Sequence, residues 1–238
     1  MNLRAPYYLS FLIGIFLLLS SAMAFSQNNT LSLRFVPILN GQELTLGAVD
    51  DTIGNSSVQV DLFRFYISNL VFSSESGSRC EFAQQYFLID AEHPESLVLQ
   101  LPQKHPVRYD KIEFDLGLDS LTNVSGAIGG ALDPTSGMYW TWQSGYINLK
   151  LEGTTDEVTA TPQPFQFHLG GYAFPNATIQ HISLDQMPSN DMIVFIDLDA
   201  FFIASPPLLQ GFQSNVMSPG PMAVALSKRM AQSFQKTR

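Results

Sequence analysis

Two tryptophans stand two residues apart and could support redox chemistry or ligand stacking. Trp140 and Trp142 are the only tryptophans of the chain, and Tyr139 and Tyr146 stand close to them. On an extended backbone, residues i and i+2 point to the same face, so the two indole rings should lie side by side. Rings placed in this way can belong to a core, form a stacking platform or be a target of oxidation.

One of the four histidines, His168, has a sequence context that suits a binding site. In Phe-Gln-Phe-His-Leu-Gly-Gly, residues 165–171, three apolar residues alternate with Gln166 and His168. That alternation predicts a strand that buries its apolar face and carries the imidazole on the other. The paired glycines that follow allow a tight turn or a close approach of a ligand. Neutral imidazole is a metal ligand, although a strand-end histidine bonded to the backbone is the more common role.

The sequence lacks the motifs of several common enzyme classes. It has no Gly-x-Ser-x-Gly elbow, no phosphate-binding loop and no His-Glu-x-x-His helix. Asp197 and Asp199 would share a strand face, and Asp115 and Asp119 flank Gly117. Carboxylates in such positions are most often solvated strand ends and turns. We therefore expect no catalytic residue in this chain.

Strands must position these side chains, because strand periodicity dominates the chain. Short alternating segments are separated by turn-forming pieces such as Asn40-Gly41 and Gly129-Gly130. Many short strands of this kind favour an all-β fold, an antiparallel sandwich or a barrel-like arrangement. The predicted strands cover residues 31–35, 58–67, 86–89, 97–101, 109–118, 145–152, 164–169, 178–184 and 192–198.

A short helix is predicted near the C-terminus. Ser-Pro-Gly-Pro at residues 218–221 opens a segment, 222–234, with helical composition and basic residues late in it. Earlier in the chain, residues 154–162 have the length of a hairpin loop between two predicted strands. The strand that begins at Gly145 and the strand that carries His168 should therefore be neighbours.

The N-terminus predicts export. Arg4 precedes an apolar run, residues 9–19, and Ala22-Met23-Ala24 matches a small-x-small cleavage signal. The run is shorter than the roughly 18 to 20 residues that a membrane-spanning helix needs. We expect a signal peptide over residues 1–24 and a single β domain over residues 25–238. After cleavage this domain should be soluble in the periplasm or outside the cell.

Charge and cysteine content narrow the function classes further. Removing Arg4 leaves 11 Lys and Arg against 21 Asp and Glu, a net charge of −10. An acidic chain has no electrostatic footprint for nucleic acid. Cys80 is the only cysteine and stands in a polar stretch, residues 73–81, that we expect to be a loop. No internal disulfide is possible, so the fold must depend on its core.

Several segments occur in an order that resembles the MbnP-like copper-binding protein family, over nearly the whole mature chain. The two strongest motifs are Gly-Met-Tyr-Trp-Thr-Trp-Gln-Ser-Gly-Tyr, residues 137–146, and Phe-His-Leu-Gly-Gly, residues 167–171. The other matching segments are residues 63–70, 86–90, 116–120, 147–153 and 217–221.

The resemblance implies an exported, β-rich protein that handles copper. Relatives bind copper through histidines and a kynurenine. A partner di-haem enzyme, similar to cytochrome c peroxidases, makes the kynurenine by oxidising a family tryptophan. Carried over by motif, His168 is the metal ligand. Trp140 and Trp142 are both candidates for modification, and the motif does not choose between them.

Neighbours of the tryptophans complete the site that the resemblance implies. Met138, Tyr139 and Tyr146 would line it, and the soft thioether of Met138 or Met217 suits Cu(I). The resemblance also places Val124 where copper-binding relatives have a histidine after an asparagine. Valine has no donor atom, so one expected ligand is missing.

Three functions therefore remain open from the sequence. The first is copper binding at His168, with Trp140 or Trp142 as a target of oxidation. The second is a metal-free extracytoplasmic binding module, in which both indoles with Tyr139 and Tyr146 form an aromatic platform for a glycan or peptide. The third is a structural accessory protein whose tryptophans are core. None of the three makes this chain an enzyme.

Overall fold

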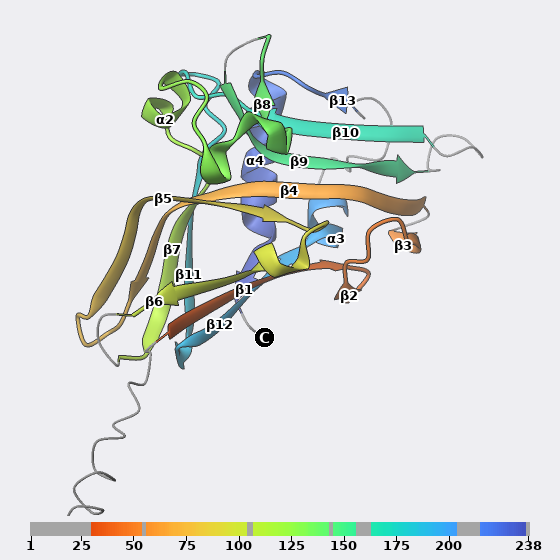
Figure 1. Cartoon of the computed structure of the whole chain (residues 1–238). Coiled ribbons are helices and arrows are strands. Elements are labelled where there is room, and N and C mark those ends of the chain that lie inside the picture. The colour runs from red at the N-terminus through yellow and green to blue at the C-terminus, as the bar shows by residue number, and fades with distance from the viewer. Residues whose placement is uncertain are drawn as a thin grey trace, which may run out of the picture.

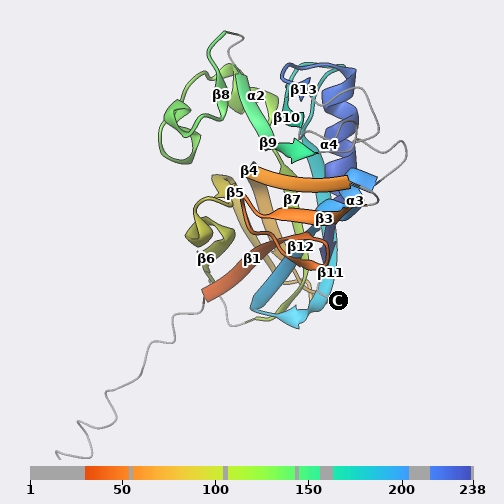
Figure 2. The ribbon, with the colours of Figure 1, turned by 90° about the vertical axis from the view of Figure 1, so that its right-hand side faces the viewer.

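Two β-sheets packed face to face form most of the fold (Figure 1, Figure 2). The computed structural model describes residues 30–53, 56–103, 107–142, 145–155, 163–203 and 215–236. The predicted signal peptide, residues 1–24, lies outside the described residues. Within these ranges, no helix is long and apolar enough to cross a membrane.

The larger sheet has nine strands in the described chain. Its main path runs in the order β11, β7, β4, β9, β10, β13, while β3 and β5 also pair with β4, and β8 pairs with β9. The strands are β3 (Val49–Ile53), β4 (Ser56–Ser73), β5 (Arg79–Asp90), β7 (Tyr109–Leu116), β8 (Tyr139–Trp140), β9 (Gly145–Thr155), β10 (Gln163–Gly170), β11 (Gln180–Ser189) and β13 (Asn215–Val216).

The smaller sheet has five strands among the described residues, and its path runs β14, β12, β1, β2, with β6 also paired to β1. These strands are β1 (Thr30–Leu39), β2 (Gln42–Glu43), β6 (Val98–Pro102), β12 (Asp191–Asp197) and β14 (Phe234–Lys236). The helices are α2 (Ser120–Val124), α3 (Leu198–Ile203) and α4 (Pro221–Ser233), and 3-10 turns cover Pro94–Leu97, Gly130–Leu132 and Pro134–Ser136.

Alternation along β4 shows how the sequence builds the main core. Phe63, Phe65 and Ile67 are buried between the two sheets, whereas Arg64 and Tyr66 point to the outer face of the larger sheet. The main core includes side chains of β1, β12, α3 and α4. The apolar face of each element is thereby removed from water, which is the main stabilising term of the fold.

A second, smaller core lies on the outer face of the larger sheet. Residues 117–142, with α2 and β8, fold over this face, and Figure 1 shows them in green beside β9 and β10. The residues buried in this second core are Tyr66, Leu118, Leu132, Met138, Trp140, Tyr146 and Ile147.

The predicted fold class is confirmed, with one correction to the strand directions. The chain forms a sandwich-like all-β fold with a short C-terminal helix, α4, as expected. In the described part of the chain two strand pairs are parallel, β1 with β12 and β10 with β13. Partners far apart in sequence can enter a sheet in either direction, whereas short hairpins force antiparallel pairs.

Two local predictions were wrong. Cys80 is buried on β5 rather than exposed in a loop, because the exposed Arg79 and Glu81 beside it are the outer positions of a strand. Asp197 ends β12 and Asp199 lies in α3, so the two carboxylates do not share a strand face. Asp197 Oδ1 instead accepts a hydrogen bond of 3.0 Å from the backbone N–H of Ala200.

Candidate functional site

A transverse row of four polar side chains crosses the outer face of the larger sheet. Asp90 on β5 pairs in register with Arg64 on β4, Arg64 pairs with Lys150 on β9, and Lys150 pairs with His168 on β10. Residues opposite each other on neighbouring strands have Cβ atoms about 5 Å apart. His168 therefore lies next to the Lys150 ammonium group. The row continues through Arg64 on β4 and ends at the Asp90 carboxylate on β5.

His168 is buried and held by a carboxylate. Its side chain is on β10, and its Nε2 lies 2.6 Å from Glu152 Oε1 on β9. Burial lowers the pKa of His168, and the nearby Lys150 ammonium lowers it further, against the opposing effect of the Glu152 hydrogen bond. A neutral imidazole beside a carboxylate carries its proton on Nε2 and donates it, which leaves the lone pair on Nδ1.

Lys150 is a half-buried cation beside a second cation. The Cβ position built on Gly137 lies 3.9 Å from both Lys150 Nζ and Arg64 Nη1, so the two positive groups converge on this turn. Burial lowers the pKa of Lys150 and Arg64 lowers it further, while Glu152 raises it. Like charges opposite each other are unfavourable, and the carboxylates of Glu152 and Asp90 offset them.

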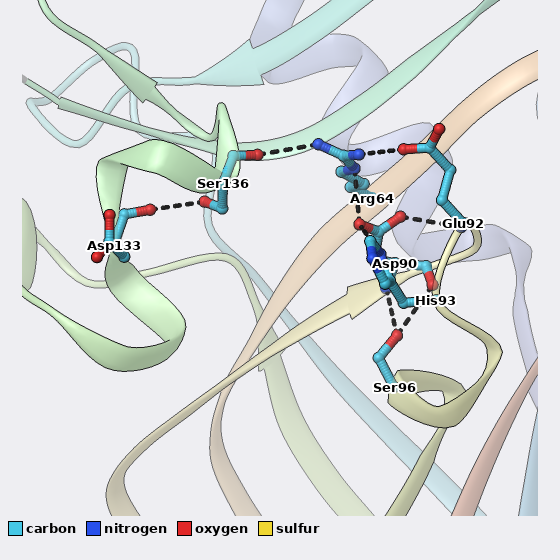
Figure 3. Close-up of polar contacts among 7 residues, drawn as sticks. All are labelled: Arg64, Asp90, Glu92, His93, Ser96, Asp133 and Ser136. Atoms are coloured by element: carbon cyan, nitrogen blue, oxygen red, sulfur yellow. Dashed lines mark hydrogen bonds and ion pairs between the residues drawn. The ribbon is translucent and has the colours of Figure 1, made fainter.

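Arg64 ties the sheet to the segment that leads into the tryptophans (Figure 3). Its Nη1 donates a 2.9 Å hydrogen bond to the Ser136 carbonyl, and its Nη2 forms an ion pair with Glu92. Its Nε lies 2.8 Å from Asp90 Oδ2, but the N–H is not directed for a hydrogen bond, so this contact is an ion pair. Asp90 Oδ2 also lies 3.0 Å from His93 Nδ1. The turn before β8 is thereby fixed to β4 and β5.

The two indole rings lie side by side, as the spacing predicted. Their centroids are 5.8 Å apart, yet Trp140 ends β8 and Trp142 belongs to the turn beyond it. Trp140 is 6% exposed and Trp142 is 65% exposed. A Cβ built on Gly170 would come within 2.6 Å of the Trp140 ring, so that ring rests directly on β10, two residues past His168. Trp142 therefore faces the solvent, while Trp140 lies against the strand that carries His168.

The other aromatic and sulfur candidates belong mainly to the second core. Met138 and Tyr146 are buried, and half-buried Tyr139 packs edge to face on Tyr146 with ring centroids 4.9 Å apart. The Tyr146 hydroxyl donates a 3.0 Å hydrogen bond to the Leu132 carbonyl and accepts one from the N–H of Ile128. Trp142 is therefore the most exposed ring of the four in the proposed aromatic platform.

The family resemblance led us to expect a histidine ligand at position 124, where this chain has valine. Val124 is 62% exposed at the end of α2. The preceding Asn123 is buried, and its Oδ1 accepts a 2.8 Å hydrogen bond from the N–H of Tyr146. Tyr146 precedes Lys150, the partner of His168, by four strand residues, which is roughly 13 Å.

Reasoning from the sequence missed the charged neighbours of His168, among them Glu152 and Lys150. Glu152 stands two residues after Lys150, and the two alternate with buried leucines, a pattern that could have placed both on the outer face. Across the part of the chain that the structure describes, no group of three His, Cys, Asp or Glu side chains is arranged to hold a metal ion. His168 is therefore not part of such a group among the described residues.

Comparison with known proteins identifies relatives of this arrangement. The family model described as MbnP matches residues 28–218. Among solved structures, MbnP from Methylosinus trichosporium is similar with a TM-score of 0.52 and 18% sequence identity, over 75% of this chain and 78% of that protein. No curated protein matches the chain. At this identity, the structural similarity concerns the fold.

Proposed function

The chain belongs to the MbnP family, and on this premise we propose that it is an exported copper-binding protein with His168 as a ligand. One observation carries the proposal, the 2.6 Å contact between His168 Nε2 and Glu152 Oε1. Histidines that bind metals usually donate their second ring N–H to a carboxylate, which fixes the tautomer and orients the ring. Glu152 has that relation to His168.

The surroundings of His168 favour Cu(I) over harder metal ions. The imidazole is neutral, as a ligand must be, because burial lowers its pKa. Hard cations such as Ca²⁺ take six to eight oxygen ligands, whereas His168 is placed on a strand with a single adjacent carboxylate. Bound copper would supply one-electron redox chemistry close to the Trp140 ring.

A titration with Cu(I) tests this proposal. The mature protein, kept anaerobic and reduced, competes with a chromophoric Cu(I) chelator, and we expect one copper per chain. His168→Ala should abolish stoichiometric binding. His181→Ala is the matched control, because His181 is also bonded to a carboxylate, at 3.0 Å from Asp115, but is exposed. Absence of binding by the wild type, or equal loss in both variants, would contradict the proposal.

The tryptophan pair supports a second part of the proposed function. We propose that the chain is a substrate, not a catalyst, and that a di-haem partner enzyme oxidises Trp140 or Trp142 to kynurenine. Trp142 is exposed to a partner and its ring lies 5.8 Å from that of Trp140. Ring opening adds two oxygen atoms from an oxidant such as peroxide or dioxygen, and hydrolysis then releases one carbon as formate.

Peptide mapping tests the modification. Protein from the native host should yield a peptide with Trp140 and Trp142 in which one carbon has been replaced by one oxygen, and fragmentation should assign the residue. Protein made without the partner enzyme should lack the change. An unmodified peptide from the native host would contradict this part of the proposal while leaving copper binding open.

An exposed phenylalanine beside a surface hollow favours a metal-free binding module as a second candidate function. Phe174 is 96% exposed and borders a hollow of about 190 Å³ with Tyr172 and Pro219 among its lining residues. Trp142→Ala and Phe174→Ala should then weaken peptide or glycan binding with little loss of stability. Because Trp140 is buried, Trp140→Ala should instead cost about 3 to 5 kcal/mol.

A further inference from the structure

We propose that the thioether of Met217 is a second copper ligand beside His168, an inference that rests on the proposed function. The first observation is strand register. β13 runs parallel to β10, with Asn215 opposite Gln166 and Val216 opposite Phe167. In a parallel pair each further residue advances both strands together, so Met217 follows Val216 at the level of His168.

The chain beyond β13 remains alongside β10, although regular pairing ends at Val216. A Cβ built on Gly171 would lie 3.0 Å from the Cβ of Pro219, so that proline contacts the backbone just past the end of β10. Val216 and Pro219 thus fix the segment at two levels of the neighbouring chain. Met217 lies between these levels and next to His168.

Alternation places both side chains on the same side of the sheet. Val216 and Phe167 are buried together in the main core. Their successors, Met217 and His168, therefore point to the opposite, outer face. Met217 is 43% exposed, in agreement with this direction, whereas Met138, the other thioether near the tryptophans, is buried in the second core.

The chemistry of the pair fits Cu(I). A thioether is a soft, uncharged donor and selects Cu(I), while imidazole binds copper well in general. The two neutral donors do not have to lose a proton before they bind copper at neutral pH. Neither donor brings a negative charge close to the Lys150 ammonium. The arrangement also explains how a site can form although Val124 replaces the histidine of copper-binding relatives. The second donor would come from β13 instead of α2.

X-ray absorption of the Cu(I)-loaded mature protein tests the inference. We expect a sulfur neighbour of copper in the wild type, and its loss in Met217→Leu, which removes the sulfur at nearly constant volume. Cu(I) affinity should fall by at least about tenfold, the loss that a supporting residue alone can cause. Met222→Leu is the matched control, since Met222 is similarly exposed on the same segment. It should retain the sulfur signal and the affinity.

The outcomes separate the two proposals. Copper that binds in a His168-dependent way with only nitrogen and oxygen neighbours, and with unchanged affinity in Met217→Leu, overturns the role of Met217 and leaves the proposed function intact. A sulfur signal that disappears in Met222→Leu also overturns it. A wild-type protein that binds no Cu(I) overturns both.

Discussion

At the scale of single residues, the properties of His168 depend on its neighbours. Glu152 accepts a hydrogen bond from Nε2, which orients the ring, while burial and the Lys150 ammonium opposite in register lower the pKa of His168 and keep the imidazole neutral. A ligand that is oriented before the metal arrives loses less freedom on binding. Another carboxylate–histidine pair, His181 with Asp115, lacks this burial and is open to solvent.

Glu152→Gln tests whether the carboxylate supports copper binding. The amide would hold the ring less strongly, and we expect Cu(I) affinity to fall on the order of tenfold to a hundredfold. The measurement is the competition titration with a chromophoric chelator. Glu113→Gln, beside the exposed His181, serves as the control and should bind Cu(I) like the wild type. Equal affinities in all three proteins would show that Glu152 has no supporting role.

Tyr66 provides a test of the second core and its pH dependence. Burial raises the pKa of Tyr66 to about 12, against a smaller lowering by Ser136, and its hydroxyl has no hydrogen-bond partner of acceptable geometry among the described atoms. The pKa is higher folded than unfolded, so its contribution to stability is complete below pH 10. This contribution to the free energy of unfolding is lost as the pH rises from 10 to 12, at about 1.4 kcal/mol per pH unit.

Tyr66→Phe should therefore change stability little at pH 7 and should reduce the loss of unfolding free energy at high pH. Urea unfolding from pH 7 to pH 11.5 measures both effects. Tyr146→Phe is the contrast, because it leaves the Ile128 N–H without its partner and should cost about 1 to 3 kcal/mol at pH 7. Identical pH profiles for wild type and Tyr66→Phe would refute the assignment.

Gly170→Ala tests the contact between Trp140 and β10. The added Cβ would meet the Trp140 ring and the Tyr146 carbonyl oxygen, each at 2.6 Å, so the ring must move. We expect a loss of about 1 to 3 kcal/mol in unfolding free energy, with a shift in tryptophan emission. Gly129→Ala, which has open space around its Cβ, should leave both unchanged. A silent Gly170→Ala variant would mean that Trp140 does not pack there.

The sequence predicted part of this site, and local patterns explain which part. Side-by-side tryptophans and a histidine on a strand follow from spacing alone, and both predictions are confirmed. The length of residues 154–162 also predicted that β9 and β10 are neighbours, and this is confirmed. The register that brings Glu152 to His168, and the pairing of β13 with β10, depend on separate segments and are contained in no local pattern. For the same reason, the sequence offered Met138 and Met217 as equal candidates, and only the fold distinguishes the buried thioether from the exposed one.

At the scale of elements, Arg64 connects three parts of the chain. It joins β4, the end of β5 and the 3-10 turn before β8 through its contacts with Asp90 and the Ser136 carbonyl (Figure 3). The turn carries Met138 and Trp140 into the second core. The segment over the outer face is thus held by a charge contact as well as by apolar packing.

Arg64→Ala should destabilise the protein by about 3 kcal/mol, because it leaves the mostly buried Asp90 carboxylate without its cation. Urea unfolding at pH 7 provides the measurement. Arg34→Ala removes an exposed ion pair with Glu43 and should cost about 0 to 1 kcal/mol. Similar losses in the two variants would show that the Arg64 contacts do not connect these elements.

The elements were largely predictable, and the exceptions share one cause. Alternation located nine strand segments, because burial of one face imposes it, and the Ser-Pro-Gly-Pro start followed by helical composition located the C-terminal helix. Cys80 was misassigned because its exposed neighbours are polar, and the two parallel pairs require partners from distant parts of the chain. The short helices α2 and α3 carry too few residues for a helical period to be seen.

At the scale of the whole molecule, the sandwich carries the proposed site on the outer face of its larger sheet. The main core is closed between the two sheets, while α2, β8, β10 and β13 gather at one end (Figure 1, Figure 2). Residues 116–149 at this end carry only two charged side chains, Asp119 and Asp133, in an otherwise acidic chain. Under the proposed function, this low charge and the exposed Trp142 would suit contact with the partner enzyme.

The most direct test of the account is native mass spectrometry of the protein purified from its own host. One spectrum reports the bound metal and the covalent state of the chain together. We predict a mature chain that carries one copper ion, with the metal lost in His168→Ala and retained in His181→Ala. A chain that is free of copper in the wild type, or whose copper persists in His168→Ala, would contradict the central claim.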